Sequence, residues 1–97
     1  MKTYEQLMED LRADNSIAFK QLFCQRLKEL RHERNLSQKA VAYRLGYAVS
    51  TYANWEQGRT EPSIYDLFCL MSVFEIDANE LFDFINNDPL LELAIQR

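Results

Sequence analysis

Glycine and proline are scarce in this chain, which has only two of each among its 97 residues. Apolar residues make up 47% of the sequence, a share well above that of disordered segments. Leucine, glutamate, arginine and alanine, which favour helices, are common. The composition therefore excludes a disordered chain and predicts a single all-α domain, since a chain of this length buries a modest core without cross-links.

Long apolar runs are also missing. The longest are only a few residues, far short of the roughly 20 needed to span a bilayer. The N-terminus does not pair a basic start with an apolar segment, as a signal peptide does. We therefore expect a cytoplasmic protein without a membrane partner.

Cysteine and histidine are too few for most metal sites and catalytic arrangements. Cys24 and Cys69 lie far apart, each within a helical pattern and without a second metal ligand beside it. Buried reduced thiols are the favoured interpretation, with a disulfide or a metal site as the alternatives. His32 lies in a charged run and is expected at the surface. Because no Ser/His/Asp, Cys/His or glycine-rich phosphate pattern occurs, we expect neither an enzyme nor a cofactor.

The net charge is −4, but the charges are unevenly distributed. Residues 19–63 hold eight basic and four acidic side chains, whereas residues 64–97 hold one basic and seven acidic ones. This asymmetry is typical of a protein with one basic face and an acidic remainder. It permits a polyanionic partner despite the overall sign, although solvated helix faces also carry such runs.

Helical periodicity and capping residues divide the chain into seven expected helices. Thr3 and Gln6 form a capping-box pattern, which predicts a short amphipathic helix ending near Arg12. Residues 13–16 (ADNS) are interpreted as a break, after which a second helix runs to about Arg34 and stops at Asn35. The remaining helices are expected from Ser37 to Gly46, over 49–57 with Gly58 as its stop, from Pro62 and Ser63, after Asp77 or Asn79, and from Pro89.

The apolar positions of the central helices predict one shared core. The residues expected to point inward are Phe19, Leu22, Phe23, Leu27, Leu30, Leu36, Val41, Leu45, Tyr52, Trp55, Ile64, Leu67, Phe68, Leu70, Met71, Phe74, Leu81 and Phe82. Ala42 is small where two helices must approach closely, and Gly46 allows the sharp turn between them.

The stretch LSQKAVAYRLGYAVSTYANWEQGRTEPS, residues 36–63, resembles the helix-turn-helix core of the phage-repressor family, also called Cro/CI-type or Xre-type regulators. The likeness extends from about Phe19 to Phe82. The positions that match the usual pattern are Leu36, Ser37, Gln38, Ala42, Leu45, Gly46, Ser50, Thr51, Trp55, Glu56, Gly58, Arg59, Glu61, Pro62 and Ser63. The resemblance implies a five-helix DNA-binding domain over 16–83, with its motif at about 37–57, an extra amphipathic helix over 1–15 and an apolar helical extension over 84–97.

The resemblance also implies roles for single residues. The helix from Gln38 is expected to cross the DNA backbone, and the helix from Val49 to lie in the major groove. Gln38, Thr51 and Arg59 are the implied phosphate contacts. Arg31 and Glu56 match positions that form an internal ion pair in this family, with a direct phosphate contact as the alternative for Arg31.

The implied base-facing residues are Val49, Ser50, Ala53 and Asn54. Only Asn54 belongs to the side chains that recognise a base with two hydrogen bonds, whereas Val49 and Ala53 offer contacts with a thymine methyl group. Three explanations stay open. The domain reads a thymine-containing site with help from groove shape, it binds DNA mostly through phosphates, or it binds protein through Tyr43, Tyr47 and Val49.

We expect a small transcriptional regulator, most simply a repressor, that binds double-stranded DNA as a homodimer. Apolar surface at both ends of the chain is available for the dimer contact, with packing onto the core as the alternative. These residues are Tyr4, Leu7, Met8, Leu11, Phe84, Ile85, Leu90, Leu91 and Ile95. The alternative function is a protein-interaction module, such as an antirepressor or the antitoxin that binds a toxin.

Overall fold

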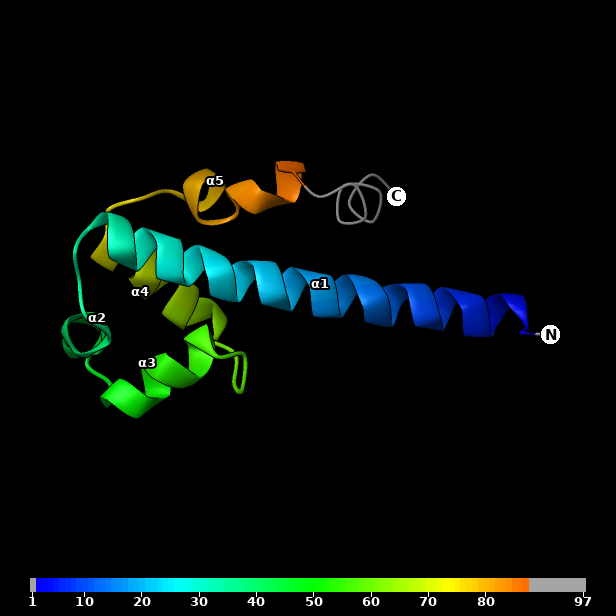
Figure 1. Ribbon diagram of the computed structural model, residues 1–97, viewed down its shortest axis with the longest axis horizontal. Helices are drawn as coiled ribbons and strands as arrows, with labels where there is room; N and C mark the ends of the chain where they lie inside the picture. Colours follow the sequence, from blue (N-terminus) through cyan, green and yellow to red (C-terminus); the bar gives the residue numbers. More distant parts are fainter. Residues whose placement is uncertain (1, 88–97) are drawn as a thin grey trace.

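The computed structural model describes residues 2–87 of the chain (Figure 1). Its elements are α1 (Tyr4–Glu33), α2 (Gln38–Leu45), α3 (Val49–Glu56), α4 (Ile64–Phe74), α5 (Ala78–Leu81) and the 3-10 helix η1 (Asp83–Asn87). Residues 2–87 contain no strand, which confirms the all-α prediction. The helix expected from Pro89 lies outside the described residues.

The expected break at residues 13–16 is wrong, because α1 is one continuous helix of 30 residues. Ala13 is the best helix former, and Asp14, Asn15 and Ser16 each cost only about 0.5–0.7 kcal/mol relative to alanine. Because the segment contains no glycine or proline, these small costs are not enough to end the helix, which continues on both sides of it. No helix therefore ends at residues 15 and 16, where the boundary between an N-terminal helix and the main domain was expected.

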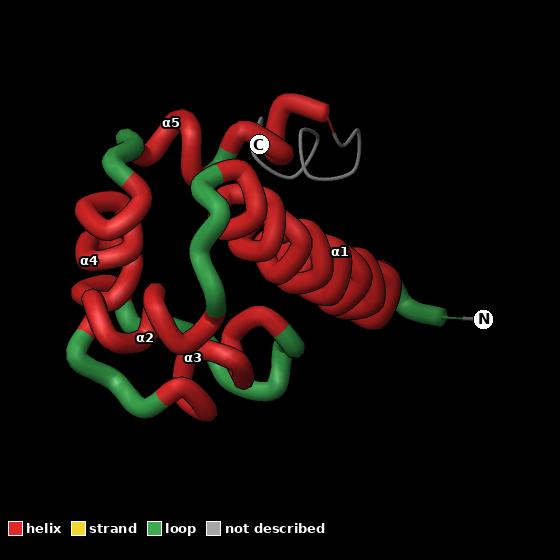
Figure 2. The backbone as a smooth tube through the Cα atoms, turned by 60° about the vertical axis from the view of Figure 1, so that its left-hand side comes forward, coloured by secondary structure: helices red, strands yellow, loops and turns green. Residues whose placement is uncertain are grey.

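The N-terminal half of α1 projects from the cluster formed by the shorter helices (Figure 2). At its start, Thr3 and Gln6 form the predicted capping box, in which each side chain accepts a hydrogen bond from the other residue's backbone N–H. Although α1 is long, neither it nor another helix of the described chain has an apolar stretch that could cross a membrane.

Residues with positive φ end the helices where the sequence indicates. Asn35 has a φ of 53° directly after the C-cap of α1, and Gly46 caps α2 with a φ of 80°. Gly58 follows α3 with a φ of 73°. These left-handed residues reverse the chain between successive helices, so that α1, α2 and α3 pack around one core.

The core lies between α1 and the helices from α2 to η1. Its buried apolar residues are Phe23, Leu27, Leu30, Val41, Ala42, Tyr52, Trp55, Leu70, Phe74, Leu81 and Phe84. Phe84 was expected as free apolar surface, but it is 9% exposed and packs edge-on against Phe19 of α1. Ile85 also packs against the core, whereas Leu90, Leu91 and Ile95 lie outside the described residues.

Two of the residues expected in the core of α4 are at the surface instead. Ile64 is 88% exposed and Phe68 is 65% exposed, whereas Leu70 and Phe74 are buried. The error comes from the sequence pattern, because α4 is apolar on more than one face and periodicity alone does not choose the inner one.

Candidate functional site

The unit of α2 and α3 is held together by small and aromatic residues. Ala42 is 1% exposed where the two helices meet, and Val41 is completely buried beside it. Tyr52 and Trp55 anchor the inner side of α3, with their rings packed edge to face at 6.1 Å between centroids. These anchors fix which side of α3 points to solvent.

The outer side of α3 carries the four residues that the sequence assigns to base contacts. Val49 is 46% exposed and Ser50 is also exposed, while Ala53 and Asn54 are half-buried one turn further on. Their spacing of i, i+1, i+4 and i+5 places all four on one helix face. Gln57, which the sequence analysis did not single out, is exposed at the end of α3.

The start of α3 has no side-chain cap. The side chain of Ala48, at the N-cap position, makes no hydrogen bond, whereas Ser37 caps α2 by accepting one from the N–H of Ala40. The N–H of Thr51 donates to the carbonyl oxygen of Ala48 at 3.1 Å, so the N–H groups of Val49 and Ser50 are left to other partners, such as water or an anion. Thr51, an expected phosphate contact, lies half-buried in this first turn.

An ion pair connects α1 to α3 beneath this surface. The Nε and Nη2 atoms of Arg31 donate to the two carboxylate oxygens of Glu56 at 2.7 and 3.0 Å. Arg31 also donates to the carbonyl oxygen of Leu36 at 3.1 Å, and Gln38 Nε2 donates to Glu56 at 3.1 Å. Glu56 is only 1% exposed, so its charge is neutralised inside the protein. Arg31 thus has an internal partner.

Burial and hydrogen bonding act on the pKa of Glu56 in opposite directions. Burial is the largest single influence and raises the pKa, but the hydrogen bonds and charge of Arg31, together with the polar groups of Tyr52 and Gln38, outweigh it. The pKa of Glu56 therefore lies below its ordinary value. Burial, with the nearby Glu56 charge, also raises the pKa of Tyr52, whose hydroxyl has no hydrogen-bond partner among the described residues.

A second polar contact ties the turn between α2 and α3 to α4. The Tyr47 hydroxyl donates to Asp66 at 2.6 Å, and this hydrogen bond is the main reason that the pKa of Asp66 is lowered. Asp66 is also part of the capping box that starts α4 at Ser63. The ring of Tyr47 packs against Trp55 at 5.6 Å between centroids. Sequence analysis left this tie unassigned, because nothing local connects positions 19 residues apart.

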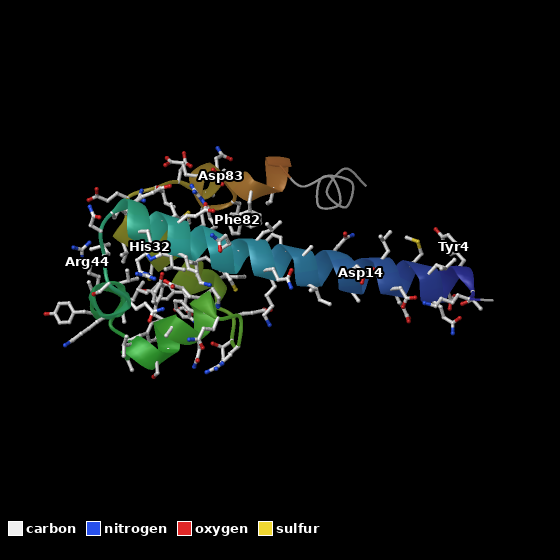
Figure 3. All side chains as sticks on the ribbon, viewed as in Figure 1. Tyr4, Asp14, His32, Arg44, Phe82 and Asp83 are labelled. Carbon is white, nitrogen blue, oxygen red and sulfur yellow. The ribbon has the colours of Figure 1, made fainter. Side chains whose placement is uncertain are left out.

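The exposed charged side chains of residues 37–60 are all basic. Between residues 37 and 60 the sole carboxylate is that of Glu56, which is buried. Lys39, Arg44 and Arg59 from the same stretch are exposed and form no ion pair with any described residue (Figure 3). Arg59 is fixed at the end of α3, since its backbone N–H donates to the carbonyl oxygen of Asn54 at 2.9 Å.

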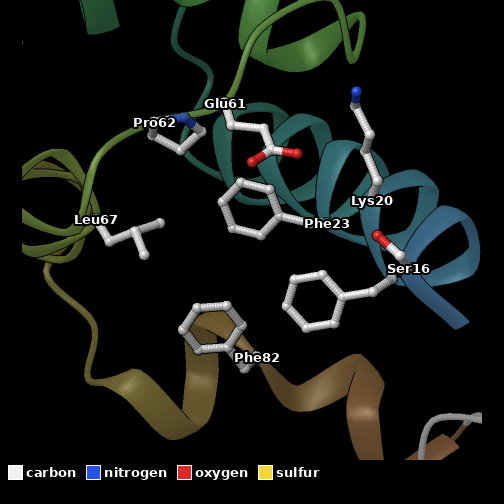
Figure 4. Close-up of a pocket in the computed structure, with 8 residues that line it drawn as sticks. Ser16, Lys20, Phe23, Glu61, Pro62, Leu67 and Phe82 are labelled. Carbon is white, nitrogen blue, oxygen red and sulfur yellow. The ribbon is translucent and has the colours of Figure 1, made fainter. Parts of the chain in front are cut away.

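Lys20 of α1 adds a further cation near Arg59. A Cβ built on Gly58 would lie 3.6 Å from Lys20 Cε and 3.4 Å from the Cys24 sulfur, so the Lys20 side chain passes close to Gly58. Figure 4 shows Lys20 pointing toward the side of the loop after α3, at the rim of a mainly apolar pocket of about 290 Å³. Sequence analysis counted Lys20 only as a charge, because its neighbour Gly58 is 38 positions away.

The cysteines and acidic residues do not form a second centre. Cys24 and Cys69 are free thiols, and burial raises the pKa of Cys24. Within residues 2–87, no three His, Cys, Asp or Glu side chains come together as a metal site requires. The surface built by α2 and α3 presents backbone N–H groups, hydroxyls, the Asn54 amide and nearby cations.

A known protein family has the same sequence pattern over more than half of this chain. The pattern of the family described as "Helix-turn-helix domain" matches residues 22–81, which include α2, α3 and the core on which they rest. This chain belongs to the Cro/CI-type helix-turn-helix family. The helix-turn-helix assignment agrees with the expected likeness over residues 19–82 and leaves most of the projecting half of α1 outside the matched region.

Several proteins with similar sequences are named as transcriptional regulators. It is 38% identical over 60 residues to the HTH-type transcriptional regulator DdrOP3 of Deinococcus deserti, covering 62% of this chain and 46% of that protein. It is 43% identical over 56 residues to the HTH-type transcriptional regulator AnsR of Bacillus subtilis, covering 58% and 48%. The chain thus spans about half the length of these two relatives.

A solved structure shows the same architecture. The crystal structure of an HTH_3 family transcriptional regulator from Vibrio cholerae superposes with a TM-score of 0.63 at 31% identity, covering 77% of this chain and 40% of that one.

A further sequence relative is named as an activator. The HTH-type transcriptional activator BcrR of Enterococcus faecalis is 29% identical over 72 residues, covering 74% of this chain and 34% of that protein.

Proposed function

We propose that this chain is a small transcriptional repressor that binds double-stranded DNA sequence-specifically, with α3 in the major groove. The strongest support is the combination of an accessible helix face and the charges of residues 37–60. The outer side of α3 is accessible to solvent, Lys39, Arg44 and Arg59 form no ion pair with a described residue, and the one carboxylate of this stretch, Glu56, is buried. A duplex is the partner that such a helix with such a charge distribution fits.

In this proposal, Val49, Ser50, Ala53 and Asn54 face the bases. Asn54 recognises an adenine with two hydrogen bonds, and Val49 and Ala53 contact thymine methyl groups. Because Ser50 discriminates weakly, the rest of the sequence preference comes from the shape of the groove. The apolar character of this face thus predicts an operator rich in A·T pairs at the positions that α3 covers.

Gln38, Thr51 and Arg59 position the domain on phosphates, together with Lys20. The Gln38 amide nitrogen has two hydrogens and donates one to Glu56, so a second donor is left for a phosphate. Thr51 and the uncapped N–H groups of α3 present donors at a helix start, where anions bind well. Repression requires nothing more than occupation of the duplex, and a cytoplasmic homodimer fits this role.

The test of the residue assignment is a pair of substitutions. Arg59→Ala should weaken binding to all duplexes alike and reduce the slope of log K against log salt by about 0.9. Asn54→Ala should instead reduce discrimination by about 1–3 kcal/mol at one base pair. Arg12→Ala on the projecting half of α1 is the matched control. If the Arg59 and Asn54 variants bind a selected operator as the parent does, the assignment is wrong.

The protein-interaction alternative, an antirepressor or antitoxin, is less well supported at this surface. Of the three residues proposed for it, Tyr43 is 85% exposed and Val49 is 46% exposed. Tyr47 is 41% exposed, but its hydroxyl donates to Asp66 and its ring packs against Trp55. One of the three side chains is therefore held within the domain, which favours DNA over a toxin or another regulator at this surface.

A further inference from the structure

The outer face of α4 is the largest apolar feature that DNA binding leaves unexplained. Ile64, Tyr65 and Phe68 are 88%, 72% and 65% exposed. Large exposed side chains that cluster on one helix are uncommon on monomeric proteins and mark interaction surfaces. Leu70 and Phe74 already fill the core side of α4, so packing within the domain does not account for these three residues.

This face leads into a groove between α4 and α5. The groove has a volume of about 490 Å³, and Phe68, Met71 and Ile76 form its apolar floor. The remaining lining residues are Ser72, Glu75, Asp77 and Glu80. Positions 64, 68, 71, 72 and 75 follow the spacing of one helix face, so the apolar strip and the groove form one continuous surface. We call this surface, residues 64–80, the α4–α5 groove.

The rim of the α4–α5 groove is negatively charged. Glu75, Asp77 and Glu80 form no ion pair with any described residue. The nearest arginines are engaged elsewhere. Arg26 donates to the Glu80 carbonyl oxygen and pairs with the Asp83 carboxylate, and Arg34 donates to the carbonyl oxygens of Leu30 and Phe74. A binding partner would therefore meet three carboxylates that pair with no cation among the described residues, beside an apolar floor; that of Asp77 also accepts a hydrogen bond from the Glu80 N–H as the N-cap of α5.

We propose that the α4–α5 groove binds an amphipathic helix of a second protein, with apolar anchors on one face and lysine or arginine beside them. The apolar residues of that helix would cover Ile64, Phe68 and Met71, and its cations would pair with the carboxylates of the rim. This inference does not depend on DNA binding, because its residues belong to α4, α5 and the link between them and none to α2 or α3. In Figure 1, α5 lies on the opposite side of α1 from α3, whereas α4 lies on the same side as α3.

The charges argue against a second copy of this chain as the occupant. A two-fold symmetric contact places the same surface of both copies together. Where that contact brings the two rims together, Glu75, Asp77 and Glu80 of one copy meet the like charges of the other, which repel at an interface. Duplex DNA is disfavoured for the same reason.

The test uses the full-length chain and two synthetic helical peptides of about 14 residues. Both have leucine at i, i+3, i+4 and i+7, and they carry either lysine or glutamate at the other positions. Titration into the 15N-labelled chain should give amide shifts for the lysine peptide, confined to residues 64–80. The glutamate peptide should bind at least about tenfold more weakly.

Variants of the chain separate the proposed groove from general attraction to an acidic protein. Glu75→Lys with Glu80→Lys should weaken the lysine peptide about tenfold or more, as should Phe68→Ser. Glu5→Lys with Glu9→Lys makes the same change in net charge on α1 and should leave the affinity as it was. Because all these side chains are exposed, circular dichroism should show an unchanged fold.

Three results would overturn the proposal. One is that both double variants weaken the lysine peptide equally, which indicates attraction by net charge alone. Another is that the amide shifts lie on α1 or α3. The third is that light scattering finds a dimer that Phe68→Ser dissociates, which makes a second copy the occupant.

Discussion

Replacement of Arg31 by alanine should destabilise the protein severely, because it leaves the Glu56 carboxylate buried without its partner. Glu56 is 1% exposed and receives two of its three hydrogen bonds from Arg31. Breaking a buried pair by removing one side costs about 3–5 kcal/mol. The free energy of unfolding of such domains is about 5–15 kcal/mol, so this loss is a large part of the total stability.

The dependence of this cost on pH follows from the pKa of Glu56. In the parent protein that pKa is lowered, so the pair contributes stability above the unfolded pKa of about 4.3 and loses it as the pH falls through the folded value. Without Arg31, burial dominates and raises the pKa. The carboxyl group is then protonated in acid and its burial costs less, so the difference between the variant and the parent should shrink toward pH 4.

Urea unfolding at pH 7 and near pH 4 measures both effects. Arg31→Met combined with Glu56→Met is the control, because replacing both charges with apolar side chains should recover most of the loss. A cost for Arg31→Ala below about 1 kcal/mol at pH 7, or one that is the same at both pH values, would refute the reasoning.

Four other substitutions test the local geometry by the same unfolding measurement. Ala48→Ser should stabilise the protein by about 1 kcal/mol, because it supplies the missing N-cap of α3, and no gain would mean that this helix start is already satisfied. Gly46→Ala and Gly58→Ala should each cost about 1–2 kcal/mol for positive φ. Neither change adds a clash, because a Cβ at position 46 meets open space and one at position 58 meets the Cys24 sulfur at an ordinary contact distance of 3.4 Å; a neutral result at either position would contradict the argument from φ. Tyr47→Phe should cost about 1.5–3 kcal/mol by removing the hydrogen bond to Asp66, and a neutral result would show that the contact adds nothing.

The motif and its turns could be predicted because their signals are local. The left-handed residues Asn35, Gly46 and Gly58 stand one or two positions beyond helix ends, where residue type alone limits the backbone. The capping boxes are equally local, since each involves residues three positions apart. The likeness to a known family added the pairing of α1 with α3 that no local pattern contains.

Other features depend on contacts between distant residues and could not be predicted. The helix α1 continues through residues 13–16 because the unfavourable helix propensities of these residues are small. A run of residues that are common at helix ends made a break look more certain than it is. The choice of inner face on α4 left Ile64 and Phe68 outside, although they are as apolar as their buried neighbours. The approach of Lys20 to Gly58 and of Tyr47 to Asp66 exists only in the folded chain.

The central claim is that the outer side of α3 reads the sequence of a duplex. Selection of binding sites from random duplexes at two salt concentrations tests it most directly. The account predicts convergence on one A·T-rich motif that is kept at the higher salt, together with weaker binding of all other duplexes as the salt rises. Selected pools without a shared motif, or retention of DNA that is insensitive to salt, would contradict it.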